Sequence, residues 1–180
     1  ALPISGLIGV RLPMAKIFSG IEIAINNLSA ENLQKAAEAI MTTDSKPKIA
    51  TSTTGKVNFA GIAKGAGMLA PSLATMLSVV MTDAKVEANR AREIFSSVCN
   101  RTFDRIDSDG CMSTNDTVLF LASGASEIAL TEEELESMLF EICSSLAYQL
   151  IADAEGHSKI VSITTVNARS ERDRKSTRLN

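Results

Sequence analysis

A single threonine near the middle of the chain has the surroundings best suited to chemistry. Thr75 follows a small, glycine-rich stretch that begins at Gly61 (GIAKGAGMLAPSLA) and directly precedes the apolar run MLSVVM. This layout would present a hydroxyl group at the junction between a loop and a strand. A threonine hydroxyl is a weak nucleophile unless a base lies beside it. Thr75 therefore becomes a candidate nucleophile only if other segments of the chain support that role.

Two glycine-containing patterns fit turns better than ligand sites. Residues 65–70 (GAGMLA) satisfy the dinucleotide pattern G-x-G-x-x-G/A, but Pro71 stands where the phosphate-binding helix should begin. Residues 107–110 (DSDG) resemble the start of a calcium loop. Glycine is fourth there rather than sixth, and Val118 occupies the twelfth position, which requires a carboxylate. We therefore expect tight backbone turns in the first pattern and an Asx turn in the second.

The histidine and the cysteines do not form a recognisable site. His157 is the only histidine, so a metal site would lack a second imidazole, and no metal is expected. A Ser-His-Asp triad is disfavoured because the chain has no G-x-S-x-G elbow. The odd number of cysteines, Cys99, Cys111 and Cys143, indicates a reducing compartment rather than a disulfide framework. Cys99 and Cys143 fall on predicted apolar helix faces, which favours core packing.

Composition indicates a globular domain or a large part of one. The chain has 180 residues, is 45% hydrophobic, and has a mean hydropathy of +0.12. The net charge of −3 gives no electrostatic argument for nucleic-acid binding. No apolar run is long enough to span a membrane, and no leader is visible, so no membrane partner is expected. The basic residues 169–180 are expected to be a disordered or artefactual tail.

Hydrophobic spacing predicts four helices and several strands. Helices are expected over 15–28, after an N-cap at Ser29, over 85–105, and from a Thr131–Glu134 capping box to Leu150. Strands are expected in the opening segment, over 75–82 and over 159–166, with a hairpin around Gly55 over 51–57. Residues 117–122 fit a strand or a helix. Because helices and strands do not alternate regularly, the fold class predicted is layered α+β.

The predicted helices each have an apolar stripe that should face a core. The stripes consist of Ile17, Ile21, Ala24, Ile25 and Leu28; Leu33, Ala36, Ala37 and Ile40; Ala88, Ala91, Ile94, Phe95, Val98 and Phe103; and Leu135, Met138, Leu139, Ile142, Leu146 and Leu150.

Five separate segments together resemble the ornithine acetyltransferase family, also known as the bifunctional glutamate N-acetyltransferase family. Their order and rough spacing agree with that family from about Ser5 to Val166. The segments are Ser5–Gly9 with Leu12–Met14, Thr42–Asp44 with Pro47–Lys48, Gly61–Leu77 (GIAKGAGMLAPSLATML), Asp109–Val118 (DGCMSTNDTV) and Asp153–Lys159 (DAEGHSK).

The resemblance implies a self-processing enzyme. The expected fold is a layered α/β/β/α sandwich of the N-terminal-threonine-nucleophile type, truncated at both ends. Autocatalytic cleavage between Ala74 and Thr75 would give residues 1–74 as the C-terminal part of an α chain. Residues 75–168 would be the N-terminal part of a β chain, followed by the tail 169–180. Once Thr75 is N-terminal, its α-amine, with a reference pKa of about 8, can accept the hydroxyl proton.

The implied activity is ping-pong acyl transfer. Thr75 would attack the acetyl group of N-acetylornithine, release ornithine, and pass the acetyl group to glutamate. Acetyl-CoA is a possible second donor, and no other cofactor is expected. Ser5 and Gly6 would form the oxyanion hole. The family has threonine at the position of Ser5, so the chain loses a methyl group that restricts the rotamer there.

The resemblance also implies four substrate contacts. These are Thr42 or Thr43, with the register left open, Lys64 for the α-carboxylate, Thr75 itself, and Glu155 for the ammonium group. The family's last contacts, an asparagine and a threonine or serine, have no counterpart in this sequence. A fragment of a layered fold also leaves strand edges and apolar faces uncovered. We therefore expect the chain alone to be marginally folded and weakly active or inactive.

The expected assembly is α2β2 in the bacterial cytoplasm, or in an organellar matrix or plastid in a eukaryote. Two other functions remain open. One is a self-processing aminopeptidase or amidase on the same fold, in which water replaces glutamate. The other is a non-catalytic binding or oligomerisation fragment.

Overall fold

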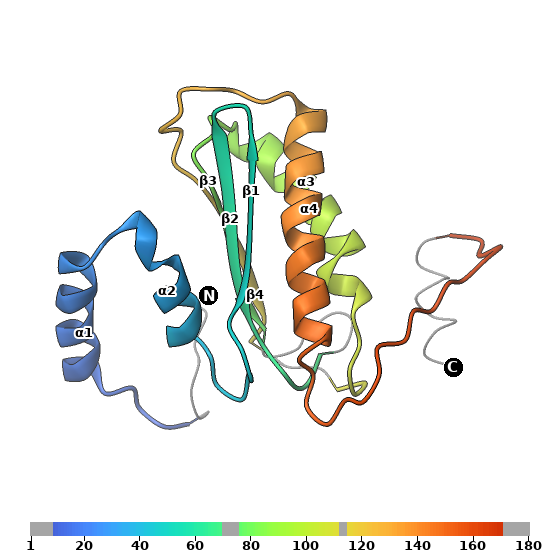
Figure 1. Ribbon diagram of the computed structural model, residues 1–180, viewed down its shortest axis with the longest axis horizontal. Coiled ribbons are helices and arrows are strands. Elements are labelled where there is room, and N and C mark those ends of the chain that lie inside the picture. Colours follow the sequence, from blue (N-terminus) through green and yellow to red (C-terminus); the bar gives the residue numbers. More distant parts are fainter. Residues whose placement is uncertain (1–8, 70–75, 112–114, 171–180) are drawn as a thin grey trace.

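The computed structural model describes residues 9–69, 76–111 and 115–170, in which one four-stranded sheet is the central element. The strands lie in chain order, with β1, β2 and β3 antiparallel and β4 parallel to β3 (Figure 1). Their bounds are β1 Lys48–Thr54, β2 Val57–Lys64, β3 Leu77–Thr82 and β4 Thr117–Ala122. The α+β class is thus confirmed, and residues 117–122 form a strand.

The hairpin predicted around Gly55 joins β1 to β2. Gly55 has a φ of +58°, a left-handed conformation that glycine adopts without the steric cost of a Cβ atom. The strand β2 continues to Lys64, so the glycine-rich stretch that begins at Gly61 starts as a strand rather than as a loop. A Cβ atom at Gly61 would lie 2.8 Å from Leu146 Cδ1 and 2.9 Å from Ile142 Cγ2. The glycine there allows a helix to approach the sheet closely.

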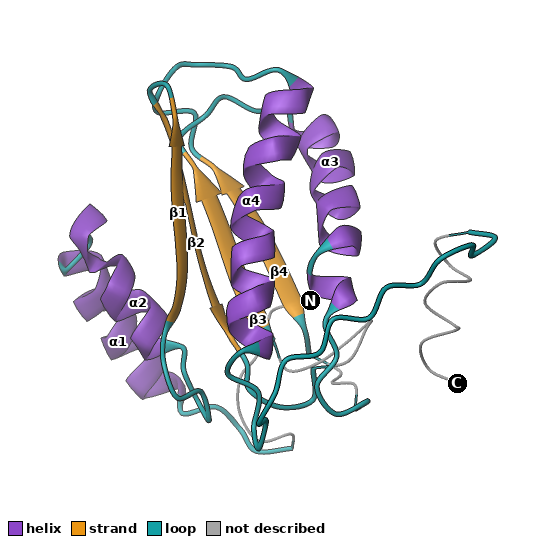
Figure 2. Ribbon diagram, turned by 45° about the vertical axis from the view of Figure 1, so that its right-hand side comes forward, coloured by secondary structure: helices purple, strands orange, loops and turns teal. Residues whose placement is uncertain are grey.

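Two long helices, α3 (Ala88–Arg101) and α4 (Glu132–Ile151), cover one face of the sheet (Figure 2). The capping box of Thr131 and Glu134 opens α4 as predicted. The six predicted stripe residues of α4 are all buried, and they share one core with Val57, Phe59, Ala63 and Val80 of the sheet. The prediction for α3 is less accurate. Ala88 is exposed, and the helix ends at Arg101 before the short 3-10 turn η2 (Phe103–Arg105).

The N-terminal helices form where predicted but do not bury the predicted stripes. They are α1 (Met14–Asn26), the 3-10 turn η1 (Ala30–Asn32), which Ser29 caps, and α2 (Leu33–Ala39). No residue of α1 is buried, and Ala37 is the only buried residue of α2. Figure 1 shows α1 standing apart from the sheet, with α2 nearer to it. Helical periodicity predicts an apolar face but does not identify what covers it.

The strand predicted over residues 159–166 is wrong. This segment has no regular secondary structure, and Val161 and Ile163 are 74% and 64% exposed. Its β-branched residues suit a strand, but strand formation depends on pairing, and no described segment pairs with it. The predicted opening strand falls mostly on residues outside the described ranges, and residues 9–12 are not a strand.

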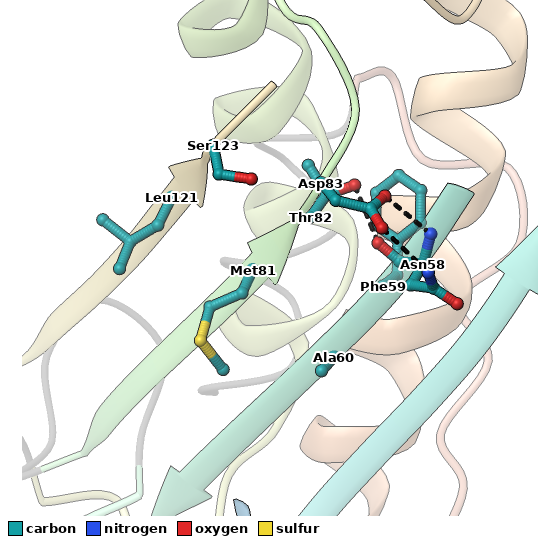
Figure 3. Close-up of a pocket in the computed structure, with 8 residues that line it drawn as sticks. All are labelled: Asn58, Phe59, Ala60, Met81, Thr82, Asp83, Leu121 and Ser123. Carbon is teal, nitrogen blue, oxygen red and sulfur yellow. Dashed lines mark hydrogen bonds between the residues drawn. The ribbon is translucent and has the colours of Figure 1, made fainter. Parts of the chain in front are cut away.

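The face of the sheet opposite α3 and α4 carries exposed apolar side chains. Leu119 and Leu121 of β4 are 39% and 52% exposed. A shallow depression of about 360 Å³ lies at one end of β2, β3 and β4 (Figure 3). Asp83 beside it accepts hydrogen bonds of 2.8 Å from the Asn58 backbone N–H and side-chain amide. No residue that we predicted as a site residue lines this depression.

Candidate active site

Two of the predicted substrate residues meet where β2 ends. Lys64 is the last residue of β2 and is only 2% exposed. Its Nζ atom donates a hydrogen bond to Thr42 Oγ1 at 3.4 Å. Thr42 and Thr43 are both exposed, and it is Thr42 that contacts Lys64. The contact with Lys64 thus distinguishes Thr42 from Thr43, which the sequence left as alternatives.

Glu155 approaches the segment that follows Lys64. Its backbone N–H donates to the Ala66 carbonyl at 2.6 Å. Its carboxyl group lies against Gly67, where an added Cβ atom would be 3.4 Å from Glu155 Cδ. The absence of a side chain at Gly67 leaves room for this carboxyl group. Lys64 is thus the first residue of the short segment 64–67, and Glu155 lies against the same segment, although 91 positions separate the two residues in the chain.

The predicted nucleophile and oxyanion hole cannot be placed directly. Thr75 and Ala74, like Ser5 and Gly6, lie outside the described residues. Met76, the next residue after Thr75, is described. Its N–H donates to Asp116 Oδ1 at 2.7 Å, and its carbonyl accepts from the Thr117 N–H at 3.0 Å.

The pairing of β2 with β3 relates Lys64 to the start of β3. Leu77, the first residue of β3, is the register partner of Lys64. The strand that follows the predicted processing position therefore begins at the same end of the sheet as Lys64 and Thr42. A residue before β3 and a residue at the end of β2 can thus serve one site.

Asp116 is a titratable residue of this region that sequence reasoning missed. Burial raises the pKa of its carboxyl group to about 6, although the hydrogen bond from Met76 and the charge of Lys64 oppose the shift. Asp116 belongs to a segment that carries the family resemblance, but no general pattern assigns chemistry to it. Its effect depends on burial, which the sequence does not show.

The loop 107–111 supports the chain that leads toward the predicted processing position. Asp109 Oδ2 accepts from the Met68 N–H at 2.7 Å, and Ser108 Oγ accepts from the Leu69 N–H at 3.1 Å. Asp107 Oδ1 accepts from the Gly110 N–H at 3.0 Å. Asp109 Oδ1 accepts from the Cys111 N–H, two residues on, at 3.0 Å. This bond confirms the predicted Asx turn, and both aspartates have structural partners.

Asp44, Lys48 and Asp153 form a buried ionic cluster that the sequence analysis did not predict. Lys48 Nζ lies 2.6 Å from Asp44 Oδ1 and 2.7 Å from Asp153 Oδ2. All three residues belong to segments of the family resemblance. Hydrogen bonds from Gly65, Lys48 and Thr42 lower the pKa of Asp44 despite the opposing effect of burial. The pKa of Asp153 is likewise lowered, because bonds from Lys48 and Ser45 outweigh burial.

The histidine and two cysteines lie as predicted. His157 is an exposed loop residue whose N–H donates to the Ala154 carbonyl at 3.2 Å. Cys143 is fully buried in the core, and Cys99 is partly buried. Burial raises the pKa of Cys99 to about 12 and also raises the pKa of Cys143, so both thiols are poor nucleophiles at neutral pH.

Comparison with known proteins shows that the chain belongs to the ArgJ family, whose model matches residues 2–178. Three curated relatives are each named "Arginine biosynthesis bifunctional protein ArgJ". The chain is 49% identical over 173 residues to the Streptomyces avermitilis protein, covering 96% of this chain and 45% of that relative. The identity is 47% over 169 residues to the Thermobifida fusca protein (94% and 44%) and 48% over 172 residues to the Mycobacterium leprae protein (94% and 42%).

The family predicted from the five segments is therefore confirmed. The chain spans less than half the length of these curated relatives. Within the described ranges, no helix combines the length and apolar character needed to cross a bilayer.

Proposed function

We propose that this chain forms part of a glutamate N-acetyltransferase that moves an acetyl group from N-acetylornithine to glutamate. The observation that carries the proposal is the pairing of Lys64 with Leu77, two residues after Thr75, at the point where Lys64 contacts Thr42. Membership of the ArgJ family, whose curated relatives are named for arginine biosynthesis, supports the same activity.

The reaction begins after cleavage of the Ala74–Thr75 bond. The freed α-amine of Thr75 accepts the hydroxyl proton as Oγ attacks the acetyl carbonyl of N-acetylornithine. The C–N bond then breaks, and ornithine leaves after its amine takes up the proton. The amine of glutamate attacks the acetyl-Thr75 ester and gives up a proton to the Thr75 α-amine. The α-amine passes this proton to Thr75 Oγ as the C–O bond breaks and Oγ leaves. The hydroxyl group of Ser5 and the backbone N–H groups of Ser5 and Gly6 stabilise the oxyanion of each tetrahedral intermediate.

Three residues around the segment 64–67 bind the amino-acid substrate in this scheme. The ammonium group of Lys64 binds the α-carboxylate, and the Thr42 hydroxyl is a further polar contact beside it. Glu155 binds the side-chain ammonium group of ornithine. We assign the threonine contact to Thr42 rather than Thr43 because Lys64 donates to Thr42. Acetyl-CoA is a possible alternative acetyl donor, and the scheme needs no other cofactor.

We also propose that the exposed part of the sheet face opposite α3 and α4, around β4, packs against a second sheet of the full-length protein, completing an α/β/β/α sandwich. The exposed Leu119 and Leu121 favour an apolar partner on this face. β2 precedes the proposed cleavage position and β3 follows it, yet they pair over Phe59–Lys64 and Leu77–Thr82. This pairing would hold the α and β pieces together in an α2β2 assembly. We place the enzyme in the cytoplasm, or in an organellar matrix or plastid in a eukaryote.

An activity assay tests the proposed function. The purified full-length protein is incubated with N-acetylornithine, with and without glutamate, and ornithine and N-acetylglutamate are quantified. We expect sustained formation of the two products in equal amounts only when glutamate is present. Without glutamate, ornithine release should stop at about one molecule per active site, when Thr75 is acetylated. Lys64→Met should abolish turnover, because the variant lacks the cation for the α-carboxylate. Continued ornithine release without glutamate, beyond one molecule per active site, would indicate an amidase. A folded, cleaved protein that releases no ornithine with glutamate present would contradict the proposal.

A further inference from the structure

We infer that Asp44, Lys48 and Asp153 form a positioning network that holds the substrate-binding residues of the candidate site in register. The inference rests on the proposed function, since it concerns how Thr42, Lys64 and Glu155 are oriented. None of the three network residues is assigned a substrate contact in the scheme above. They are therefore positioning residues rather than catalytic ones.

Lys48 is the centre of the network. It is the first residue of β1 and pairs with Ala63 of β2, and it is 0% exposed. Its ammonium group bridges Asp44, in the loop before β1, and Asp153, just after α4. These two carboxylates are 8% and 7% exposed. The network thus joins the start of the sheet to the end of the helix that covers it.

Asp44 connects the network to Thr42 and to the residue after Lys64. Its Oδ1 atom accepts from the Gly65 N–H at 2.6 Å, and its Oδ2 atom accepts from the Thr42 N–H at 3.1 Å. Lys64 in turn donates to the Thr42 hydroxyl. One carboxylate therefore fixes the backbone on both sides of the Lys64–Thr42 contact.

Asp153 connects the network to the loop that carries Glu155. It accepts hydrogen bonds from both the backbone N–H, at 3.0 Å, and the hydroxyl of Ser45. Two residues later, the Glu155 N–H binds the Ala66 carbonyl. The position of Asp153 therefore sets how the Glu155 loop meets segment 64–67.

The energetics favour a geometric role for the network. The lowered pKa values of Asp44 and Asp153 keep both carboxylates ionised near neutral pH. A buried ion pair often gives no more stability than apolar residues of similar volume would. It does, however, fix the direction of each group it bonds. Here the remaining bonds of Asp44 reach the backbone of Thr42 and Gly65, on either side of the proposed substrate-binding contact.

The test compares Asp44→Asn with a matched control, Thr102→Val, in the full-length protein. Thr102 is also buried, but its hydroxyl binds the Val98 carbonyl at the end of α3, outside the network. We expect Asp44→Asn to raise the KM for N-acetylornithine about tenfold or more with a smaller change in kcat. The control should leave KM unchanged, at a temperature where both variants are folded. A loss of thermal stability in Asp44→Asn with an unchanged KM would overturn the inference.

Two further measurements distinguish failure of the network inference from misfolding of Asp44→Asn and from failure of the proposed function. If Asp44→Asn does not fold, Ser45→Ala removes only the Ser45 hydroxyl bond to Asp153. It should raise the same KM less, and an unchanged KM would count against the network. If the wild-type protein shows no transfer activity, the proposed function fails. Faster amide hydrogen exchange at Thr42 and Gly65 in Asp44→Asn, but not in Thr102→Val, would then still support positioning, and unchanged exchange would overturn it.

Discussion

The half-buried carboxyl group of Asp116 lies against the start of β3, where it binds the Met76 N–H. Its folded pKa of about 6 exceeds the ordinary value of 3.8 that it would regain on unfolding. Between these pH values the unfolded chain releases the proton and the folded chain retains it. The contribution of Asp116 to folding stability is thus full below about pH 4 and is lost as pH rises through about 6.

Asp116→Asn should remove this pH dependence. We expect the melting temperature of the variant, relative to the wild type, to rise between pH 4 and pH 7, because asparagine is neutral at every pH and can still accept the Met76 N–H. Glu141→Gln is the matched control, since Glu141 is an exposed carboxylate of α4. An identical pH slope for Asp116→Asn and the wild type would show that Asp116 does not titrate in this interval.

Single residues also show why the candidate site was only partly predictable. The resemblance proposed Lys64 and Glu155, which the structure brings to segment 64–67, and it left Thr42 and Thr43 as alternatives. It did not identify the Asp44–Lys48–Asp153 network, whose members lie up to 109 positions apart in the chain. No spacing rule connects such residues, because their contact arises only when α4 packs on the sheet.

At the scale of elements, the close approach of α4 to β2 depends on Gly61. A Cβ atom there would be less than 3.0 Å from side chains of both Leu146 and Ile142, so Gly61→Ala must displace the helix or strain the core. We expect the free energy of unfolding to fall by about 1–3 kcal/mol, measured by denaturant unfolding.

Gly20→Ala is the matched control for this substitution. Gly20 lies inside α1, and a Cβ atom there would meet nothing within 4 Å. The control should be neutral or stabilising by up to about 1 kcal/mol, since alanine favours a helix over glycine. Equal effects of the two substitutions would contradict the proposed role of Gly61 in helix–sheet packing.

Elements were predicted well where local chemistry defines them. The capping box at Thr131 and the turn at Gly55 are satisfied by residues a few positions away, so their sequences were sufficient. The prediction of a strand over residues 159–166 was wrong, because a strand needs a partner that is distant in the chain. The predicted burial of the apolar stripe of α1 was wrong for the same reason, since burial of a helix face also depends on what packs against it.

At the scale of the whole molecule, α3 and α4 cover one face of the sheet (Figure 2). On the other face α2 lies against β1 and β2, while Leu119 and Leu121 of β4 stay exposed within the described residues. The proposed processing bond lies between β2 and β3, two neighbouring strands of one sheet. Cleavage would therefore create a new N-terminus without separating the strands that flank it. This arrangement suits an enzyme that must first cut its own chain to make its nucleophile.

The most direct test is the intact mass of the purified full-length protein beside its Thr75→Ala and Thr75→Ser variants. The account predicts two pieces in the wild type, one ending at Ala74 and one beginning with Thr75. It predicts one uncut chain in Thr75→Ala, which lacks the hydroxyl group, and cleavage in Thr75→Ser, which retains one. A single uncut mass for a wild-type protein that melts cooperatively would contradict self-processing and the role of Thr75 as the nucleophile.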